Sequence, residues 1–196
     1  MNQIKVLGIC GLARCGKDTF YSLAQDQLSR MGYNPIRITF AEALRMDVYD
    51  FLLEKTGIDA FTEVTEEKNI IRDFLVAYGS KLMRRIDERC WINKVESYVK
   101  ERINAGDLVV FTDVRYPNEL SWIQDSLDGV ALHISRINNV APNNEEAHND
   151  PLLSGRANMK FSWGDFNDAQ PSRQDSVAVQ GAISKLMKNP AYVQYV

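Results

Sequence analysis

The fold class follows first from the segment Gly11-Leu12-Ala13-Arg14-Cys15-Gly16-Lys17-Asp18-Thr19, which contains the pattern Gly-x-x-x-x-Gly-Lys. Before it, residues 4–10 form a short apolar run that is typical of a buried strand. After it, residues 17–30 carry apolar side chains at helical spacing, and Gly32 marks the stop. A strand, a glycine loop ending in lysine, and a helix together provide the context that a phosphate-binding loop requires.

The residue types in this loop suit the binding of phosphate groups. Glycines at both ends allow the backbone to curl, so that successive N–H groups point toward phosphate oxygens. The positive end of the helix dipole lies at the same place, and the ammonium group of Lys17 can reach the β and γ phosphates. We therefore predict a nucleotide phosphate site made by Gly11, Leu12, Ala13, Cys15, Gly16, Lys17, Asp18 and Thr19.

One position departs from the general pattern, because most such loops place Ser or Thr directly after the lysine to bind Mg²⁺. This chain has Asp18 there, followed by Thr19. A carboxylate at this position can bind Mg²⁺ or one of its waters. Alternatively, Thr19 takes the magnesium role, or Asp18 is only a favourable charge at a helix N-terminus.

A second motif begins with the unbroken apolar run of residues 108–112, which is typical of a strand buried on both faces. Asp113 follows at its carboxyl end, where nucleotide-hydrolysing and kinase folds place an aspartate that organises Mg²⁺. Arg115 lies two residues further on, in position to face the same crevice. The alternative is an aspartate that only caps the next turn.

Alternating strands and helices predict an α/β protein with a parallel sheet covered on both faces. The helical block between the second and third strands is too long for a simple crossover and indicates an inserted lobe. Thr65 is the expected cap of one of its helices. Besides those above, we predict strands at residues 35–40, 130–134 and 159–162, helices at 41–53, 65–79, 80–87, 91–103, 118–127 and 174–188, and a polar, mobile excursion at 138–155.

Composition excludes several other classes. The chain has 196 residues, 45% of them hydrophobic, which argues against disorder. Its net charge of −3 argues against sequence-independent nucleic-acid binding, which needs a broad basic face. No apolar run approaches the roughly 20 residues that cross a bilayer. Three cysteines and two histidines indicate neither a disulfide framework nor a zinc site, and we expect a cytoplasmic protein.

Two segments, Arg14-Cys15-Gly16-Lys17-Asp18-Thr19 and Asp113-Val114-Arg115-Tyr116-Pro117-Asn118-Glu119, together resemble the bacteriophage deoxynucleoside monophosphate kinases. That family pairs an Arg-Ser-Gly-Lys-Asp-Thr loop with an Asp-Val-Arg-Phe-Pro-Asn-Glu strand end. Phe40-Ala41-Glu42-Ala43-Leu44 resembles the family's Phe-Ala-x-x-Leu, and Arg72-Asp73-Phe74-Leu75-Val76-Ala77-Tyr78-Gly79 resembles Arg-x-x-Leu-Gln-x-x-Gly. Trp91 matches a tryptophan at similar spacing.

The resemblance covers residues 4–136 and explains the aspartate after the lysine, which family members carry. It implies an adenylate-kinase-like, three-layer P-loop fold with a five-stranded parallel sheet in a single domain. The core would comprise residues 1–40 and 106–196, a helical acceptor-binding insertion residues 41–105, and a lid residues 137–156.

The resemblance also implies that ATP donates its γ-phosphoryl group to a deoxynucleoside 5′-monophosphate. Lys17, Arg14, Asp113 and Arg136 would be the catalytic residues. The implied acceptor-binding residues are Phe40, Arg72, Trp91, Arg115 and Glu119, and the implied Mg²⁺ ligands come from Asp18, Thr19 and Asp113. A homodimer in the cytoplasm of an infected bacterium is also implied, with no nucleic-acid or membrane partner.

The match weakens after Arg136. Family members follow the fourth strand with Arg-Pro and later a His-x-Ser/Thr-Glu segment, whereas this chain has Arg136-Ile137-Asn138 and His148-Asn149-Asp150-Pro151. A closing lid is expected to supply arginines, and Arg136 and Arg156 are the candidates.

Other interpretations stay open. Phe40 and Trp91 are equally consistent with ordinary core aromatics. Another P-loop kinase of small molecules, similar to phosphomevalonate or dephospho-coenzyme A kinase, is one alternative function. A nucleotide-binding regulatory or assembly protein without turnover is the other, and the divergent lid supports it.

Overall fold

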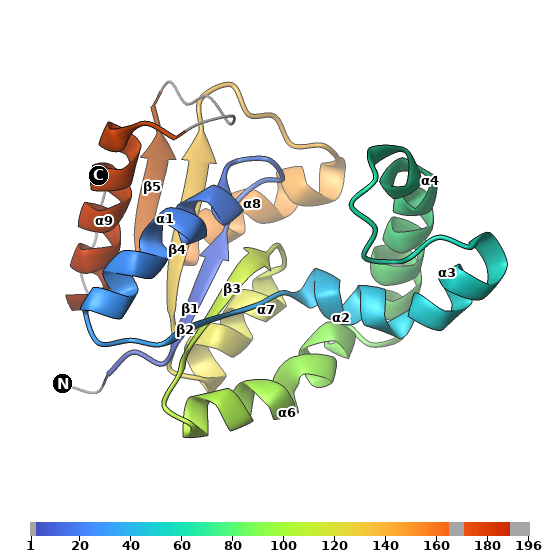
Figure 1. The fold of residues 1–196 in the computed structure, drawn as a ribbon, viewed down its shortest axis with the longest axis horizontal. Helices are drawn as coiled ribbons and strands as arrows, with labels where there is room; N and C mark the ends of the chain where they lie inside the picture. The colour runs from blue at the N-terminus through green and yellow to red at the C-terminus, as the bar shows by residue number, and fades with distance from the viewer. Residues whose placement is uncertain (1–2, 165–170, 189–196) are drawn as a thin grey trace. The chain divides into compact units, whose positions relative to one another are not determined.

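A computed structural model describes residues 3–164 and 171–188, and these contain a five-stranded sheet in which every strand pair is parallel (Figure 1). The strand order is β2-β3-β1-β4-β5. The predicted α/β class with five parallel strands is thereby confirmed. The strands are β1 (Val6–Cys10), β2 (Pro35–Ile38), β3 (Leu108–Val114), β4 (Val130–Arg136) and β5 (Met159–Trp163).

The first strand forms the centre of the sheet. Leu7 lies opposite Val110 of β3 on one side and Val130 of β4 on the other. Every residue of β1 is buried, as expected for a parallel strand with both faces covered. Because parallel strands end at the same edge, the loop after β1 emerges between the carboxyl ends of β3 and β4.

Helices α1 (Lys17–Arg30) and α9 (Arg173–Lys188) cover one face of the sheet (Figure 1). Phe20 and Leu28 of α1 join Ile183 of α9 and Leu7 and Ile9 of β1 in a single buried cluster. The predicted first and last helices agree with α1 and α9 to within one residue at each end. Helix α1 begins at Lys17, directly after the glycine loop, and its packing on the sheet holds this end in place.

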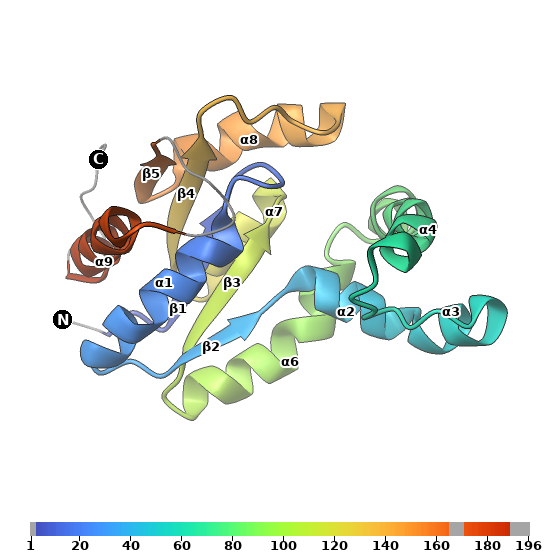
Figure 2. The ribbon, with the colours of Figure 1, turned by 45° about the horizontal axis from the view of Figure 1, so that its top comes forward.

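The other face is covered by α7 (Pro117–Ser121), the π-helix η2 (Trp122–Ser126), α8 (Asn144–Arg156) and the end of α6 (Cys90–Asn104), as Figure 2 shows. Phe111 of β3 packs edge-on against Trp122, with ring centroids 5.7 Å apart. The strands are thus buried on both faces.

Among the described residues, none of the helices combines the length and the apolar character that crossing a bilayer requires.

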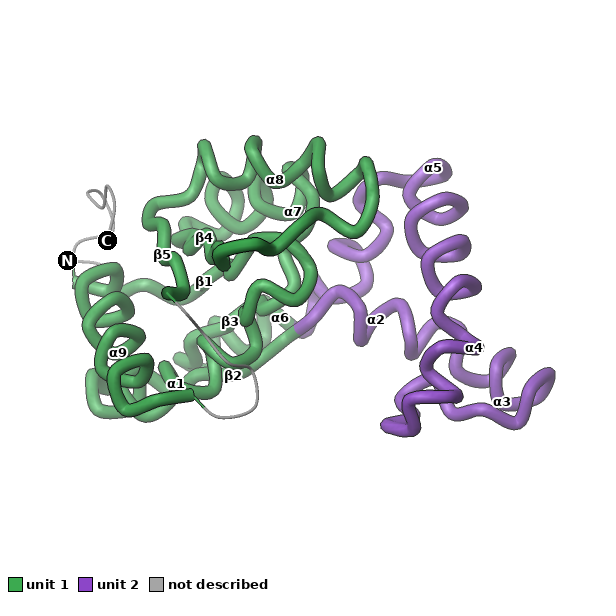
Figure 3. Tube along the Cα trace, turned by 90° about the horizontal axis from the view of Figure 1, so that it is seen from above, with its two compact units in different colours: residues 1–38, 99–196 green, residues 39–98 purple. Residues whose placement is uncertain are grey.

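The chain divides into two compact units (Figure 3). Unit 1 contains the sheet and comprises Met1–Ile38 and Val99–Val196, whereas unit 2 is Thr39–Tyr98. Unit 2 has a small core of its own around Leu52 and Ile71. Its helices are α2 (Phe40–Asp47), α3 (Tyr49–Thr56), α4 (Thr65–Val76), the π-helix η1 (Ala77–Met83), α5 (Arg84–Ile86) and the first part of α6.

Several predicted boundaries within unit 2 are wrong. The strand predicted at 35–40 ends at Ile38, because the hydroxyl of Thr39 accepts a hydrogen bond from the Glu42 N–H (3.0 Å) and starts a helix. The helix predicted at 41–53 breaks at Val48 into α2 and α3. Thr65 is not a cap but the first helical residue, and the helical segment that begins there continues without a break through η1 and α5.

The polar excursion predicted at residues 138–155 is also wrong, because most of it is helix α8. The side chain of Asn143 caps this helix by accepting a hydrogen bond from the Glu146 N–H (2.8 Å). Glu145 and Glu146 lie in the first turn, where carboxylates stabilise the helix dipole. Pro151 lies inside the helix, so the prolines were a misleading signal for irregular structure.

Candidate functional site

The glycine loop, residues 11–16, leaves the carboxyl end of β1 at the centre of the sheet. Asp113 and Arg115 stand at the end of β3, and Arg136 ends β4. Ligands of open α/β sheets bind outside these carboxyl ends, where successive connections leave in opposite directions. The structure therefore brings the two sequence motifs to the same edge of unit 1.

The loop requires glycine at both of its ends. Gly11 has a φ of 133°, and a Cβ atom there would lie 2.2 Å from the carbonyl oxygen of Ile134. Gly16 has a φ of 89°, and its Cβ would lie 2.5 Å from Nε1 of Trp163. Side chains are therefore excluded at both positions by backbone conformation and by space.

The first turn of α1 presents N–H groups that suit an anion. Gly16 is the N-cap residue, and no side chain of the described residues caps this end of α1. The first N–H groups of a helix have no acceptor within the helix, and the helix dipole makes this end positive. The backbone geometry thus agrees with what a phosphate-binding loop needs.

Lys17 lies at the same point and is 7% exposed. Its Nζ donates hydrogen bonds to the carbonyl oxygens of Gly11 and Leu12, both at 2.7 Å. The ammonium group is therefore held inside the loop rather than in solvent. Burial raises the pKa of the neighbouring Cys10 and Cys15 thiols, although Lys17 partly opposes this, so neither is activated as a nucleophile.

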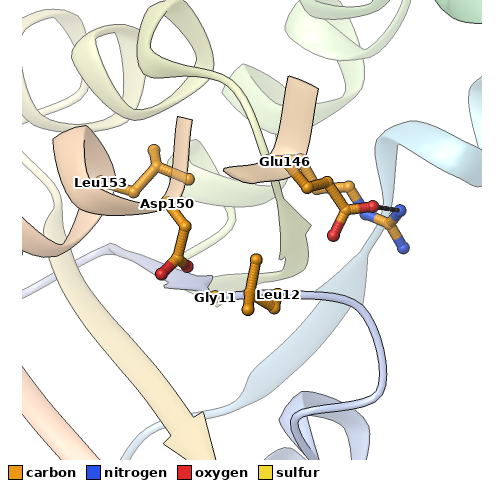
Figure 4. Close-up of a pocket in the computed structure, with 6 residues that line it drawn as sticks. Gly11, Leu12, Glu146, Asp150 and Leu153 are labelled. Atoms are coloured by element: carbon orange, nitrogen blue, oxygen red, sulfur yellow. Dashed lines mark hydrogen bonds and ion pairs between the residues drawn. The ribbon is translucent and has the colours of Figure 1, made fainter. Parts of the chain in front are cut away.

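A carboxylate from α8 occupies the loop. Oε2 of Glu146 accepts a hydrogen bond from the Ala13 N–H at 2.8 Å, and Oε1 accepts one from Nη1 of Arg115 at 3.0 Å. Beside it is a pocket with about 160 Å³ of empty space, lined by Gly11, Leu12, Arg115, Glu146, Asp150 and Leu153 (Figure 4). No sequence motif marks Glu146, because it lies in a polar segment that also contains Pro142 and Pro151.

Asp18 is engaged by an arginine that the sequence analysis missed. Its Oδ1 accepts a hydrogen bond from Nη2 of Arg37 at 2.8 Å, and Nε of Arg37 donates to the hydroxyl of Thr112 at 3.0 Å. The Asp18 carboxylate is 74% exposed, so the ion pair adds little stability. Arg37 orients the carboxylate, which stays largely open to solvent.

A second pair without a sequence motif links β4 to α8. Nε2 of the buried His133, on β4, lies 2.9 Å from Oδ1 of Asp150, which lines the pocket (Figure 4). This contact joins α8 to the sheet. The alternation of side chains along β4 explains it, because Leu132 and Ile134 face α1 and α9 while His133 faces α8.

The remaining predicted residues of unit 1 vary in exposure. Arg14 is exposed, with a positive φ of 62°, and Thr19, Asp113 and Arg136 are half-buried. Glu119 is buried, and its Oε2 accepts hydrogen bonds from the N–H groups of Arg115 (2.9 Å) and Tyr116 (3.1 Å). Arg156, the second lid candidate, instead pairs with Asp125 at 3.0 Å.

The predicted acceptor-binding residues Phe40, Arg72 and Trp91 belong to unit 2. Phe40 and Trp91 are 3% and 2% exposed, which is typical of core aromatics, and Nε1 of Trp91 donates to the Gly79 carbonyl at 3.3 Å. Arg72 is exposed on α4. In the same unit the hydroxyl of Tyr78 donates to Asp47 (2.7 Å), which raises the pKa of Tyr78 to about 12.

The described residues contain no group of three or more His, Cys, Asp or Glu side chains that could hold a metal by themselves. In nucleotide sites Mg²⁺ keeps several waters and takes only one or two protein ligands besides phosphate oxygens. Asp18, Thr19 and Asp113 supply oxygen ligands of the appropriate type. The oxygen atoms of these side chains are of the type that binds Mg²⁺.

No protein-family model matches this sequence, and no curated protein does. Solved structures do resemble the fold. TT1252 from Thermus thermophilus matches with a TM-score of 0.51 and 12% identity, covering 98% of this chain and 100% of that one. A sugar kinase from Janibacter sp. HTCC2649 has a TM-score of 0.44 at 11% identity, covering 98% and 99% of the two chains.

A gluconokinase from Sinorhizobium meliloti 1021 has a TM-score of 0.42 at 13% identity, covering 96% of this chain and 97% of that one. At these identities the comparisons show the fold alone, and the match to TT1252 carries that conclusion. The chain has an α/β fold with a parallel sheet flanked by helices.

Proposed function

We propose that this chain is a kinase that transfers the γ-phosphoryl group of ATP to a deoxynucleoside 5′-monophosphate, giving ADP and a deoxynucleoside diphosphate. The observation that carries the proposal is the loop between β1 and α1, where glycine geometry, the start of a helix and the buried Lys17 ammonium coincide. The acceptor class rests on the resemblance of Asp113–Glu119 and Arg72–Gly79 to the phage kinases.

Phosphoryl transfer between two phosphate groups requires mainly positioning and positive charge. In the proposed reaction a phosphate oxygen of the acceptor forms the new P–O bond while the bond to ADP breaks, so no general base is needed. Lys17 and the loop amides bind the donor phosphates, and Arg14 and Arg136 offset charge on the transferred group. Mg²⁺, when bound, neutralises phosphate oxygens, and Asp113 and Asp18 or Thr19 hold it or its waters.

A coupled assay of ADP release tests this proposal. The purified chain is incubated with ATP, Mg²⁺ and, in turn, each deoxynucleoside monophosphate, phosphomevalonate and dephospho-coenzyme A. We expect turnover with at least one deoxynucleoside monophosphate and none with the other two acceptors. Turnover only with phosphomevalonate or dephospho-coenzyme A would support a kinase activity but contradict the proposed deoxynucleoside monophosphate acceptor.

A nucleotide-binding protein without turnover is the second candidate. The observation that favours it is the Glu146 carboxylate, which lies where a phosphate group would accept the Ala13 N–H. ATP binding without ADP release for any acceptor would support this candidate. The proposed kinase function predicts both binding and release.

A further inference from the structure

The contact between Glu146 and the glycine loop has the chemistry of a bound phosphate. We propose that Glu146 is an internal anion that fills a phosphate subsite formed by the Ala13 N–H and the Arg115 guanidinium, and that a nucleotide must displace it. This inference rests on the proposed function, since it concerns the same loop. It adds a regulatory element, carried by α8, that the motifs do not reveal.

The carboxylate is bound as a phosphate would be. Each oxygen accepts one hydrogen bond, from a loop amide at 2.8 Å and from a guanidinium group at 3.0 Å. A backbone N–H of a glycine loop and an arginine fork are the donors that recognise phosphate oxygens in proteins. The Glu146 side chain is 10% exposed, so these two partners, rather than water, supply the hydrogen bonds to its carboxylate oxygens.

The backbone around Glu146 is held in place independently. Asn143 caps the helix through the Glu146 N–H, and the side-chain amide of Asn149 donates to the carbonyl of Arg115 at 3.2 Å. Asp150, one turn further, contacts His133 at 2.9 Å. The carboxylate is therefore delivered by an ordered helix and is not a freely rotating surface side chain.

The segment before α8 also contacts the loop, because the side-chain amide of Asn139 donates to the Ala13 carbonyl at 3.1 Å. Both polar groups of Ala13 are thus bound by the segment 139–146. With Glu146 in place, its side chain lines the adjacent pocket together with Gly11, Leu12 and Arg115. Withdrawal of Glu146 releases the amide and Arg115 and enlarges this space.

An internal competitor lowers the apparent affinity of an external ligand by the fraction of molecules in which the site is free. Removing the charge of Glu146 should therefore tighten nucleotide binding. Glu146→Gln preserves size and removes the charge, whereas Glu145→Gln is the matched control in the next position. Glu145 accepts a hydrogen bond from the Tyr116 hydroxyl (2.8 Å) and has no described contact with the loop.

The test is titration calorimetry of the full chain with ATP and with inorganic tripolyphosphate, each with and without Mg²⁺. We expect Glu146→Gln to lower the Kd for both ligands about tenfold, the scale of one charge-assisted hydrogen bond. Glu145→Gln should stay within about twofold of the unmodified chain. The ligand-free Tm of Glu146→Gln should fall slightly, because the Ala13 N–H and Arg115 exchange a charged acceptor for a neutral one.

A lower Tm combined with tighter nucleotide binding distinguishes displacement from a purely structural role. Replacing a residue with only a structural role would lower the Tm without tightening binding. If Glu146→Gln does not fold, Glu146→Asp retains the charge but shortens the side chain by one methylene, and it should also tighten binding. Unchanged or weaker ATP binding in a folded variant overturns the internal-anion role and leaves the proposed function intact. If Glu146→Gln weakens ATP binding only when Mg²⁺ is present, Glu146 would instead act as a ligand of the metal. Absence of binding in every variant would overturn both proposals.

Discussion

Replacing Lys17 with alanine is expected to lower kcat/KM for ATP by about a thousandfold or more, the scale for loss of a group that stabilises charge in the transition state. The ammonium is buried in the loop and held by two carbonyl groups, so its position is set before a nucleotide arrives. Alanine cannot supply this charge. The measurement is steady-state ADP release with the best acceptor found.

The matched control is Lys5→Ala, which removes an exposed lysine just before β1. It should keep near-normal kinetics. Far-ultraviolet circular dichroism and Tm establish that the Lys17 variant remains folded. A folded Lys17→Ala variant with near-normal kcat/KM would show that the donor phosphates bind elsewhere.

Replacing Arg72 with alanine should raise the KM for the monophosphate about 10- to 100-fold and leave the KM for ATP within about threefold, because a charge-assisted contact to the acceptor phosphate is lost. Arg72 is exposed on α4 and belongs to unit 2, whereas the glycine loop belongs to unit 1. KM values are measured by varying each substrate at saturation of the other.

Arg85→Ala is the control, since Arg85 is another exposed arginine on a helix of unit 2. We expect it to change neither KM. Equal increases in both KM values for Arg72→Ala would remove Arg72 from the acceptor site, and no change in either would do the same.

The sheet was predictable because its signals are local. Residues 108–111 are continuously apolar and include the β-branched Val109 and Val110, which is typical of a strand buried on both faces, and they form most of β3. The glycine loop was equally clear, since Gly11 and Gly16 both have the positive φ angles that the motif implies. Local pattern and tertiary structure agree at these positions.

Helix α8 was not predictable in the same way. Its sequence is polar and contains Pro151, and its stability depends on the Asn143 cap and on the contact of Asp150 with His133 across the fold. Phe40 lies in α2 and not in the predicted strand, because Thr39 caps the start of that helix. The sequence does carry this signal, because Thr39 and Glu42 have the Thr-x-x-Glu spacing that is typical of a helix start.

The site itself was only partly predictable. The motifs located the loop, Asp113 and Arg115, but the partners that bind them come from distant positions with no motif of their own. Arg37 reaches Asp18 from β2, and Glu146 reaches Ala13 across 133 positions of sequence. Such pairs follow from the parallel topology, which brings the ends of β1, β3 and β4 to one edge.

The most direct test is to follow the backbone amide resonances of the isotopically labelled chain by NMR while ATP is added. If the loop binds the triphosphate, the amide signals of Ala13, Gly16 and Lys17 should move most, and saturably, while those of α9 stay in place. Saturable shifts confined to other segments, or none at millimolar ATP, would contradict the account.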